Sequence, residues 1–355
     1  MGRIPMLAWR SSCKISATAF PFVAKPGRTR VGLSLMYEQF FGLRERPFDL
    51  VPNPRFLYLS QRGREAVANL RYGLAFPRGL TLLLGDAGTG KTTLVSQVVS
   101  EIDPRRVQCV LLSNPTLTRN EFYEMLTEGF GLAAEAIASK PKFLVLFRAH
   151  LEARHAAGLL TAIVLDEAQS LTDELLEEVR LLSNIDTPQS KLVNVILAGQ
   201  PELAERLNDP RLRHLKQRIS LRCELGALDY GETAAYIAGR LRIAGGEPGS
   251  IFSREAILAI HETSRGIPRT INVVCDNALI SGFATQTRPI VRAIVDEIRR
   301  DFDLTRQPSA LGQAGRVDTA DSLLPAPIPV SVAVPDAAAP SNQVAPARKG
   351  RFNFF

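Results

Sequence analysis

The sequence has few cysteines and no long apolar run, and each shortage excludes a class of protein. Only four of the 355 residues are cysteine, far apart and without a C-x-x-C pair. The sequence therefore predicts neither a zinc knuckle nor a disulfide-stapled secreted domain. It favours a reducing, cytoplasmic compartment. No stretch reaches the roughly 18 apolar residues of a membrane-spanning helix. The best candidate, residues 323–334, contains three prolines.

An excess of positive charge is also missing from the body of the chain. The formal net charge is +7, but residues 1–35 hold six Lys or Arg and no acidic residue, and residues 304–355 hold five against three. Residues 36–303 are left with a net charge of −1. This balance does not favour nucleic acid as a partner of the folded part.

The two ends differ in composition from the middle. Residues 1–35 match no pattern that follows, and Met36 opens the first patterned stretch. We therefore interpret residues 1–35 as a basic extension from a misassigned start codon. Residues 304–355 are rich in Pro and Ala without periodicity, which is typical of a disordered tail. Their basic and aromatic end, residues 348–355, is a candidate docking peptide.

Between the ends, apolar runs of strand length alternate with helical stretches. The runs are rich in Val, Ile and Leu and occupy residues 80–85, 107–112, 161–166, 192–199 and 218–225. Strands without polar alternation are buried on both faces, which predicts a parallel sheet flanked by helices, an α/β fold. With an N-terminal arm, this sheet forms a predicted nucleotide-binding domain over residues 36–226.

After residue 226 the pattern is helical only. Four helical stretches run through residues 227–303 and predict a small all-helical lid domain. Ser253 is a predicted N-cap, because its side chain can accept a hydrogen bond from the first turn. Pro268 and Pro289 are placed where the first turn of a helix tolerates proline.

A glycine-rich loop follows the first apolar run. Residues 85–92, GDAGTGKT, fit G-x-x-x-x-G-K-[ST] between a strand and a helix, the context that this phosphate-binding motif requires. Backbone N–H groups of such a loop surround the phosphates, Lys91 neutralises them, and the Thr92 hydroxyl coordinates Mg²⁺. The predicted nucleotide-binding residues are Gly85, Asp86, Ala87, Gly88, Thr89, Gly90, Lys91, Thr92 and Thr93.

Polar side chains end the third and fourth apolar runs. Asp166 and Glu167 lie at the carboxyl edge of the predicted sheet, where open α/β folds bind their ligands. Asp166 is predicted to join Thr92 at the Mg²⁺, and Glu167 to orient the attacking water. Gln200 could reach the γ-phosphate or this water. The alternative for Gln200 is a polar cap on the helix that begins at Pro201.

Two arginines join Lys91, Glu167 and Gln200 as candidate catalytic residues. Arg269 follows Gly-Ile-Pro at the start of a helix. This preceding segment would fix where the helix begins, so that Arg269 turns toward a nucleotide held between the two domains. Arg218 stands just before the fifth strand. The alternative for Arg218 is a surface cation among its basic neighbours.

These motifs together resemble the AAA+ ATPases and, among them, the secretion-pathway A type. The resemblance covers residues 36–302 and is carried by MYEQFFGLRERPFDLVPNPRFLYLS, the glycine-rich loop, IVLDEAQSL, LLSN, ILAGQPEL and SRGIPRTINVVCDNAL. It implies a P-loop NTPase fold with a helical lid and ATP with Mg²⁺ as cofactors. The implied site residues are a Walker A loop at Gly85 to Thr92, a Walker B pair at Asp166 and Glu167, a sensor 1 at Gln200, an arginine finger at Arg218 and a sensor 2 at Arg269.

The resemblance also implies partners. The arginine finger of such ATPases enters the site of a neighbouring subunit, so a homo-oligomer, a ring or at least a dimer, is expected with Arg218 acting in trans. The arm at residues 56–59 is expected near the adenine. Partners would be envelope secretion or polysaccharide export proteins, with the chain cytoplasmic or held at the inner membrane through them. Type II secretion members continue into a transmembrane helix and a peptidoglycan-binding region. Here a proline-rich tail follows the predicted lid, and this shorter architecture resembles instead the soluble ATPases that accompany exopolysaccharide export.

The predicted function is ATP hydrolysis that drives or regulates an envelope export or assembly system. One alternative is a DNA-associated ATP-dependent switch of the transposition-targeting or initiator type, against which stand the charge balance and the lack of a further DNA-binding domain. A second is a scaffold that binds ATP without hydrolysing it, and Glu167 argues against this because binding alone needs no water-activating carboxylate. A small-molecule kinase would need an acceptor pocket that the motifs do not indicate.

Overall fold

A computed structural model of the chain describes residues 37–302 except 52, 77–78 and 114–115. All of these residues belong to one unit, Met1–Arg306. The predictions for residues 1–35 and 304–355 lie outside the described residues. None of the helices in the described part is both long enough and apolar enough to span a membrane.

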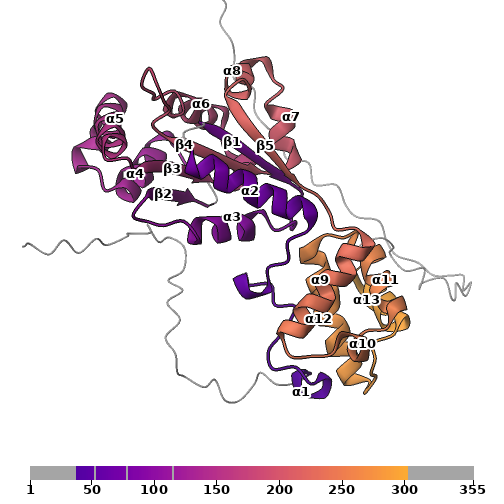
Figure 1. Cartoon of the computed structure of the whole chain (residues 1–355). Coiled ribbons are helices and arrows are strands. Elements are labelled where there is room, and N and C mark those ends of the chain that lie inside the picture. The colour runs from indigo at the N-terminus through magenta and orange to yellow at the C-terminus, as the bar shows by residue number, and fades with distance from the viewer. Residues whose placement is uncertain (1–36, 52, 77–78, 114–115, 303–355) are drawn as a thin grey trace, which may run out of the picture. The chain divides into compact units, whose positions relative to one another are not determined.

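The centre of the α/β part is a sheet of five parallel strands in the order β2-β3-β4-β1-β5 (Figure 1). The strands are β1 (Leu80–Gly85), β2 (Val107–Leu112), β3 (Leu160–Leu165), β4 (Asn194–Gly199) and β5 (Ile219–Leu225). The predicted parallel α/β fold is confirmed. Every residue of β1 and of β4 is buried, which explains why their sequences are apolar without alternation.

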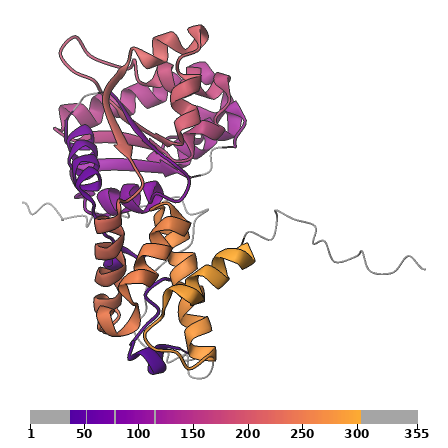
Figure 2. The ribbon, with the colours of Figure 1, turned by 90° about the vertical axis from the view of Figure 1, so that its right-hand side faces the viewer.

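Helices cover both faces of this sheet (Figures 1 and 2). Helices α2 (Gln61–Ala75) and α3 (Lys91–Ser100) pack on the face that contains Leu83. The opposite face, which contains Leu82, is covered by α4 (Arg119–Phe130), α5 (Lys140–Ala156), α6 (Asp173–Leu182), α7 (Pro201–Arg206) and α8 (Arg213–Lys216). Short 3-10 helices lie at η1 (Pro54–Phe56), η2 (Ala134–Ala138), η3 (Ala168–Ser170) and η4 (Pro210–Leu212).

Residues 227–302, called here the helical region, form a second apolar core. Its helices are α9 (Tyr230–Ile243), α10 (Pro248–Ile251), α11 (Arg254–Ser264), α12 (Pro268–Ala284) and α13 (Arg292–Phe302). The N-terminal arm packs here too, because α1 (Glu38–Phe41) and η1 contribute Phe41 and Phe56 to the same core as Ile237 and Ile271. The arm therefore runs from this core to the start of α2.

The helix boundaries follow local chemistry. Ser253 caps α11 as predicted, since its Oγ accepts a hydrogen bond from Ala256 N–H at 3.1 Å. Pro268 is the first residue of α12, also as predicted. The prediction for Pro289 is wrong, because α13 begins only at Arg292. The residue after this proline, Ile290, is buried and bridges to Phe252, so tertiary pairing holds the segment extended.

Candidate nucleotide-binding site

The Walker A loop, residues 85–92, joins the end of β1 to the start of α3. The first backbone hydrogen bond of this helix runs from Leu94 N–H to the Gly90 carbonyl at 2.9 Å. The N–H groups of the preceding turn therefore point out of the helix end, where the helix dipole adds partial positive charge. Backbone donors and dipole together favour an anion such as phosphate.

Lys91 is held inside this loop. Its side chain is 4% exposed, and Nζ donates to the carbonyl oxygens of Gly85 at 2.7 Å and Asp86 at 3.0 Å. Burial lowers the pKa of the Lys91 ammonium, and the nearby carboxylates of Glu167 and Asp166 oppose this shift. An anionic ligand in the loop would likewise stabilise the charged form.

Thr92 and Asp166 meet across the carboxyl edge of the sheet. The Thr92 hydroxyl donates to Asp166 Oδ2 at 2.6 Å, although 74 positions separate the two residues in the sequence. Asp166 is 2% exposed and also accepts the Glu167 N–H on Oδ1 at 3.0 Å. A hydroxyl and a carboxylate side by side fit Mg²⁺, which proteins hold through one or two carboxylates together with substrate phosphates.

Glu167 projects from a constrained turn after β3. Its backbone is left-handed, with φ of 54°, a conformation that costs a non-glycine residue on the order of 1–2 kcal/mol. Gln169 Nε2 donates to Glu167 Oε2 at 2.6 Å, while Gln169 Oε1 accepts the Gln200 N–H at 3.1 Å. Because a backbone N–H can only donate, the Gln169 amide has one allowed orientation, with its NH₂ group toward Glu167.

Gln200 belongs to the same group of side chains. Its Nε2 lies 3.5 Å from Glu167 Oε2. Gln200 occupies the N-cap position of α7, but its side chain makes no capping hydrogen bond. The geometry therefore places its amide at the carboxylate and not at the helix end. Sequence reasoning missed Gln169, although its position two residues after Glu167 is a signal that could have found it.

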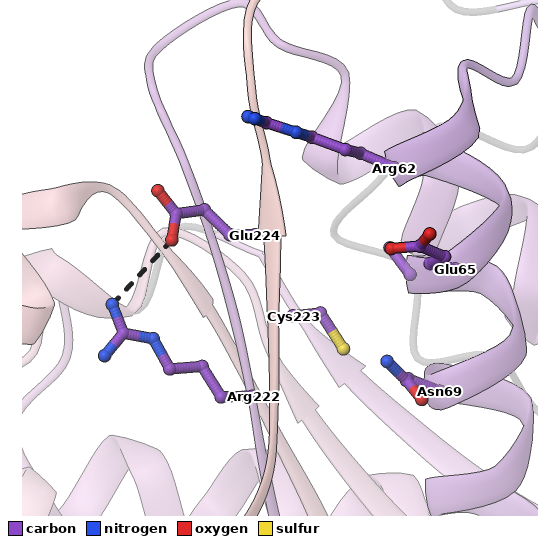
Figure 3. A pocket seen from close by; sticks show the side chains of 7 residues that line it. Arg62, Glu65, Asn69, Arg222, Cys223 and Glu224 are labelled. Carbon is purple, nitrogen blue, oxygen red and sulfur yellow. Dashed lines mark ion pairs between the residues drawn. The ribbon is translucent and has the colours of Figure 1, made fainter.

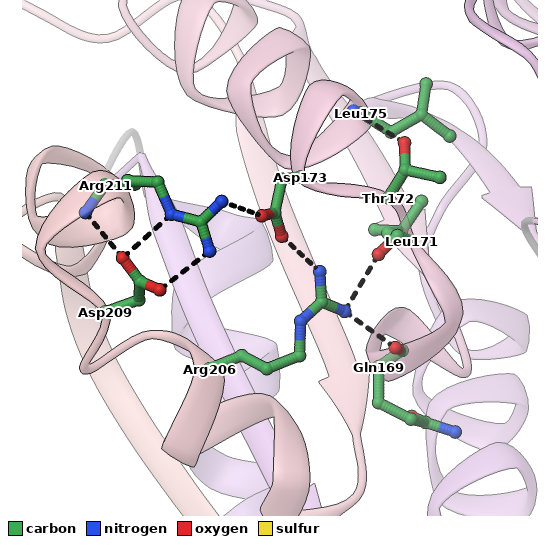
Figure 4. A network of polar contacts seen from close by, with 8 residues as sticks. All are labelled: Gln169, Leu171, Thr172, Asp173, Leu175, Arg206, Asp209 and Arg211. Atoms are coloured by element: carbon green, nitrogen blue, oxygen red, sulfur yellow. Dashed lines mark hydrogen bonds and ion pairs between the residues drawn. The ribbon is translucent and has the colours of Figure 1, made fainter.

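A hydrogen-bond network around Arg206 and Arg211 stabilises the turn after β3, which carries Glu167 and Gln169 (Figure 4). Arg206 of α7 donates through Nη1 to the carbonyls of Gln169 and Leu171, both at 2.8 Å, and through Nη2 to Asp173 Oδ1 at 2.6 Å. Asp173 also pairs with Arg211, at 3.3 Å. The network links the segment after β4 to the turn after β3, and sequence reasoning missed it because nothing local distinguishes Arg206 from other arginines.

Arg269 is brought to the Walker A loop by its backbone. Its N–H, in the first turn of α12, donates to the Gly88 carbonyl at 3.2 Å. Gly88 has φ of +82°, and a Cβ there would stand 2.8 Å from the Arg269 Cβ. Only glycine thus lets the start of α12 come so close. The Arg269 side chain is exposed and lines the cavity described below.

Gly266 lies just before α12, where the chain packs against Leu228. A substitution at Gly266 tests this junction. It has φ of +73°, its carbonyl accepts Leu228 N–H at 2.9 Å, and a Cβ would stand 1.9 Å from the Leu228 oxygen. Gly266→Ala is expected to lower the free energy of unfolding by more than the roughly 1–2 kcal/mol of a left-handed residue, as measured by denaturant titration. Gly239→Ala is the matched control.

The control glycine lies inside α9, and beyond its two adjacent residues and the backbone of its own helix, no atom lies within 4 Å of the place that an alanine methyl group would take there. Gly239→Ala should leave stability unchanged or raise it by up to about 1 kcal/mol. Equal stability of both variants would contradict the account of the junction.

A cavity of about 390 Å³ lies between the segments described above. It is lined by the Walker A loop from Gly88 onward, Glu167, several residues of the arm between Asp49 and Ser60, and residues of α9 and α12 that include Arg269. Arm residues 56–59, which were expected near the adenine, are among the lining residues. The volume is within the range of small-molecule sites.

A second concavity, of about 370 Å³, lies between α2 and the edge strand β5 (Figure 3). Its lining is mixed in charge, with Arg222 and Glu224 3.8 Å apart. It contains neither a glycine-rich loop nor any of the predicted site residues, so it is not the candidate nucleotide site.

Arg218 is the predicted residue that the structure does not bring to this site. It is exposed and precedes β5 at the end where Ile219 pairs with Leu80. The Walker A loop follows the other end of β1, a strand length of about 20 Å away. Arg218 lies near Asp186, whose pKa is lowered first by a hydrogen bond from Lys191 and to a smaller extent by Arg218.

The parallel sheet, the Walker A loop and the acidic pair at its edge define the class of protein, a P-loop NTPase. Residues 74–207 match the family described as the AAA domain. This match and the geometry of the site both support ATPase activity.

Comparison with individual proteins identifies a relative of known pathway. The chain is 43% identical over 257 residues to General secretion pathway protein A of Aeromonas hydrophila. The match covers 72% of this chain and 46% of the relative, so this chain spans about half of that protein's length.

Solved structures share the fold. The Drosophila ORC bound to DNA matches with a TM-score of 0.58 and 16% identity, covering 81% of this chain and 70% of that one. The ORC2 protein of Aeropyrum pernix, in ADPNP-ADP complexes, matches with a TM-score of 0.55 and 17% identity, covering 74% of each chain. At this identity the likeness concerns the fold alone.

Proposed function

We propose that the chain binds ATP with Mg²⁺ in the 390 Å³ cavity and hydrolyses it. The observation that carries this proposal is the meeting of Lys91, the Thr92–Asp166 pair and Glu167 at one edge of the sheet. A bound Mg²⁺ would neutralise phosphate charge there. Thr92 and Asp166 would hold it.

The chain's own residues have distinct roles in this proposal. Lys91 stabilises the phosphates, and Glu167 accepts a proton from the attacking water. Gln169 and Gln200 hold the Glu167 carboxylate in place, since both amides lie against the same oxygen, Oε2. Arg269 reaches the phosphates from the first turn of α12, which is bonded to the loop at Gly88.

We further propose that the chain forms an oligomer and that its ATP hydrolysis drives or regulates an envelope export or assembly system. The support is the 43% identity to a general secretion pathway protein. More specifically, we propose that the system is one of exopolysaccharide export. The DNA-associated alternative is less favoured, because the likeness to ORC proteins concerns only the fold and residues 36–303 have a net charge of −1.

Nucleotide binding can be tested by titration calorimetry with Mg²⁺ and ATP. Lys91→Ala should weaken binding by about 10- to 100-fold, the value of a lost hydrogen bond from a charged group. Lys142→Ala is the control, because it removes the same charge from an exposed position on α5. Equal affinity of the Lys91 variant and the wild type would contradict the proposed site.

A further inference from the structure

The part of the cavity away from the Walker A loop is built by the arm and the helical region. Phe56 and Tyr58 come from the arm, and Tyr236, Arg240 and Asn272 come from α9 and α12. Tyr58 and Tyr236 meet edge to face, with ring centroids 5.9 Å apart. If the phosphates occupy the Walker A loop, these residues are left to contact the rest of the nucleotide.

Asn272 is a buried polar residue in this part of the cavity. It is 8% exposed, and its Oδ1 accepts hydrogen bonds from Tyr236 OH at 2.8 Å and from Arg240 Nη1 at 3.2 Å. Arg240 is itself fixed, because its Nε donates to the Pro47 carbonyl at 2.6 Å and its guanidinium lies 5.1 Å from the Phe56 ring centroid.

These contacts orient the Asn272 amide. A guanidinium only donates, so the amide group facing Arg240 must be the oxygen. The tyrosine hydroxyl agrees with this, since it accepts from Arg240 Nη1 and gives its own proton to Asn272. Nδ2 therefore points away from both partners, and no described residue accepts a hydrogen bond from it. Because Asn272 lines the cavity, Nδ2 is left free to donate a hydrogen bond to a ligand bound there.

The position of Asn272 on α12 indicates which part of the ligand it meets. It lies three residues after Arg269, on the same helix face. The Arg269 N–H is bonded to Gly88 of the Walker A loop, at the phosphate end. One turn further along, Asn272 lies beside the aromatic side chains Phe56 and Tyr236, which suit the flat ring of a base.

We propose that Asn272 Nδ2 donates to a ring nitrogen of the adenine, and that Asn272 is thereby a specificity-determining residue for the nucleotide. This inference rests on the proposed ATP site. Adenine offers unprotonated nitrogens at N1, N3 and N7, and each can accept such a hydrogen bond. The network of Arg240 and Tyr236 holds the amide in the donating orientation before the nucleotide enters.

The test compares ATP with 1-deaza-, 3-deaza- and 7-deaza-ATP, each with Mg²⁺, by titration calorimetry. In the wild type, one of the three analogues should bind about tenfold more weakly than ATP, because it lacks the accepting nitrogen. Asn272→Asp keeps an acceptor for Arg240 and Tyr236 but replaces the NH₂ donor by an oxygen. This variant should bind ATP about tenfold more weakly and lose the preference for ATP over that analogue.

Asn277→Asp is the matched control. It makes the same exchange on the same helix, but Asn277 donates to the Val273 carbonyl and is not among the residues that line the cavity, so this variant should keep the preference for ATP. Equal binding of ATP and all three analogues by the wild type would overturn the inference while leaving the proposed function intact, and so would an unchanged preference in Asn272→Asp. A wild type that binds no ATP would overturn both. If Asn272→Asp does not fold, as judged by its thermal unfolding, Asn272→Ala takes its place, because it also lacks the NH₂ donor and should also lose the preference for ATP.

Discussion

Glu167→Gln is expected to leave ATP binding intact and to lower phosphate release on the order of 10²- to 10⁴-fold, the contribution of a positioned general base. The exchange is nearly isosteric, and the new amide can still present an oxygen to Gln169, which donates to Glu167 Oε2 in the native chain. The site geometry is kept while the proton acceptor is removed. Phosphate release under saturating ATP and Mg²⁺ measures the effect.

Glu174→Gln is the control for this experiment. Glu174 lies on the neighbouring helix α6, and its side chain is 76% exposed, so its loss should leave the rate within about twofold of the wild type. Equal, negligible rates for wild type and Glu167→Gln across a range of protein concentrations would favour the non-hydrolysing scaffold.

Glu167→Gln can also be used to identify the proteins that bind this chain. Because Glu167→Gln should hold ATP without cleaving it, the ATP-loaded assembly should persist. Affinity recovery of this variant with ATP, compared with ADP, should enrich envelope export proteins if the proposed role is right. Enrichment that is equal with both nucleotides would separate the partner interaction from the nucleotide cycle.

The sheet was predictable because its chemistry is local. Buried parallel strands are apolar throughout, so the run at residues 80–85 identifies β1 with the bounds that the structure has. The run at residues 107–112 also has the bounds of β2, although this edge strand is only partly buried. The Walker A loop is local too, since one short segment supplies the glycines, the lysine and the threonine. Pro289 was misjudged because the pairing of Ile290 with Phe252 depends on a residue 38 positions away.

The side chains that orient others could not be predicted from the sequence. Gln169 acquires its orientation from the backbone of Gln200, and Asn272 acquires its orientation from Arg240, 32 positions away. Arg206 is likewise defined by carbonyls 35 and 37 positions away. No spacing rule relates such residues, because their relation exists only after the sheet and the helical region have formed.

Arg218→Ala is expected to lower phosphate release about 10³-fold or more, the effect of removing an arginine finger, with little change in ATP binding. The reason is positional. Arg218 is exposed and lies a strand length, about 20 Å, from the Walker A loop of its own chain. It can therefore stabilise transferred phosphate only in a neighbouring copy. Arg213→Ala, which removes another exposed arginine from α8, should keep the wild-type rate.

Mixing two inactive variants tests the action in trans. Arg218→Ala has an intact Glu167, and Glu167→Gln has an intact Arg218, so an assembly that contains both places the arginine of one copy beside the glutamate of the other. With random mixing in equal amounts, about a quarter of the sites are complete, and phosphate release should return to that fraction of the wild-type rate. If Arg218 acted within its own chain, mixing would restore nothing, because no chain would carry both residues. If Arg218 were only a surface cation, Arg218→Ala alone would keep the wild-type rate.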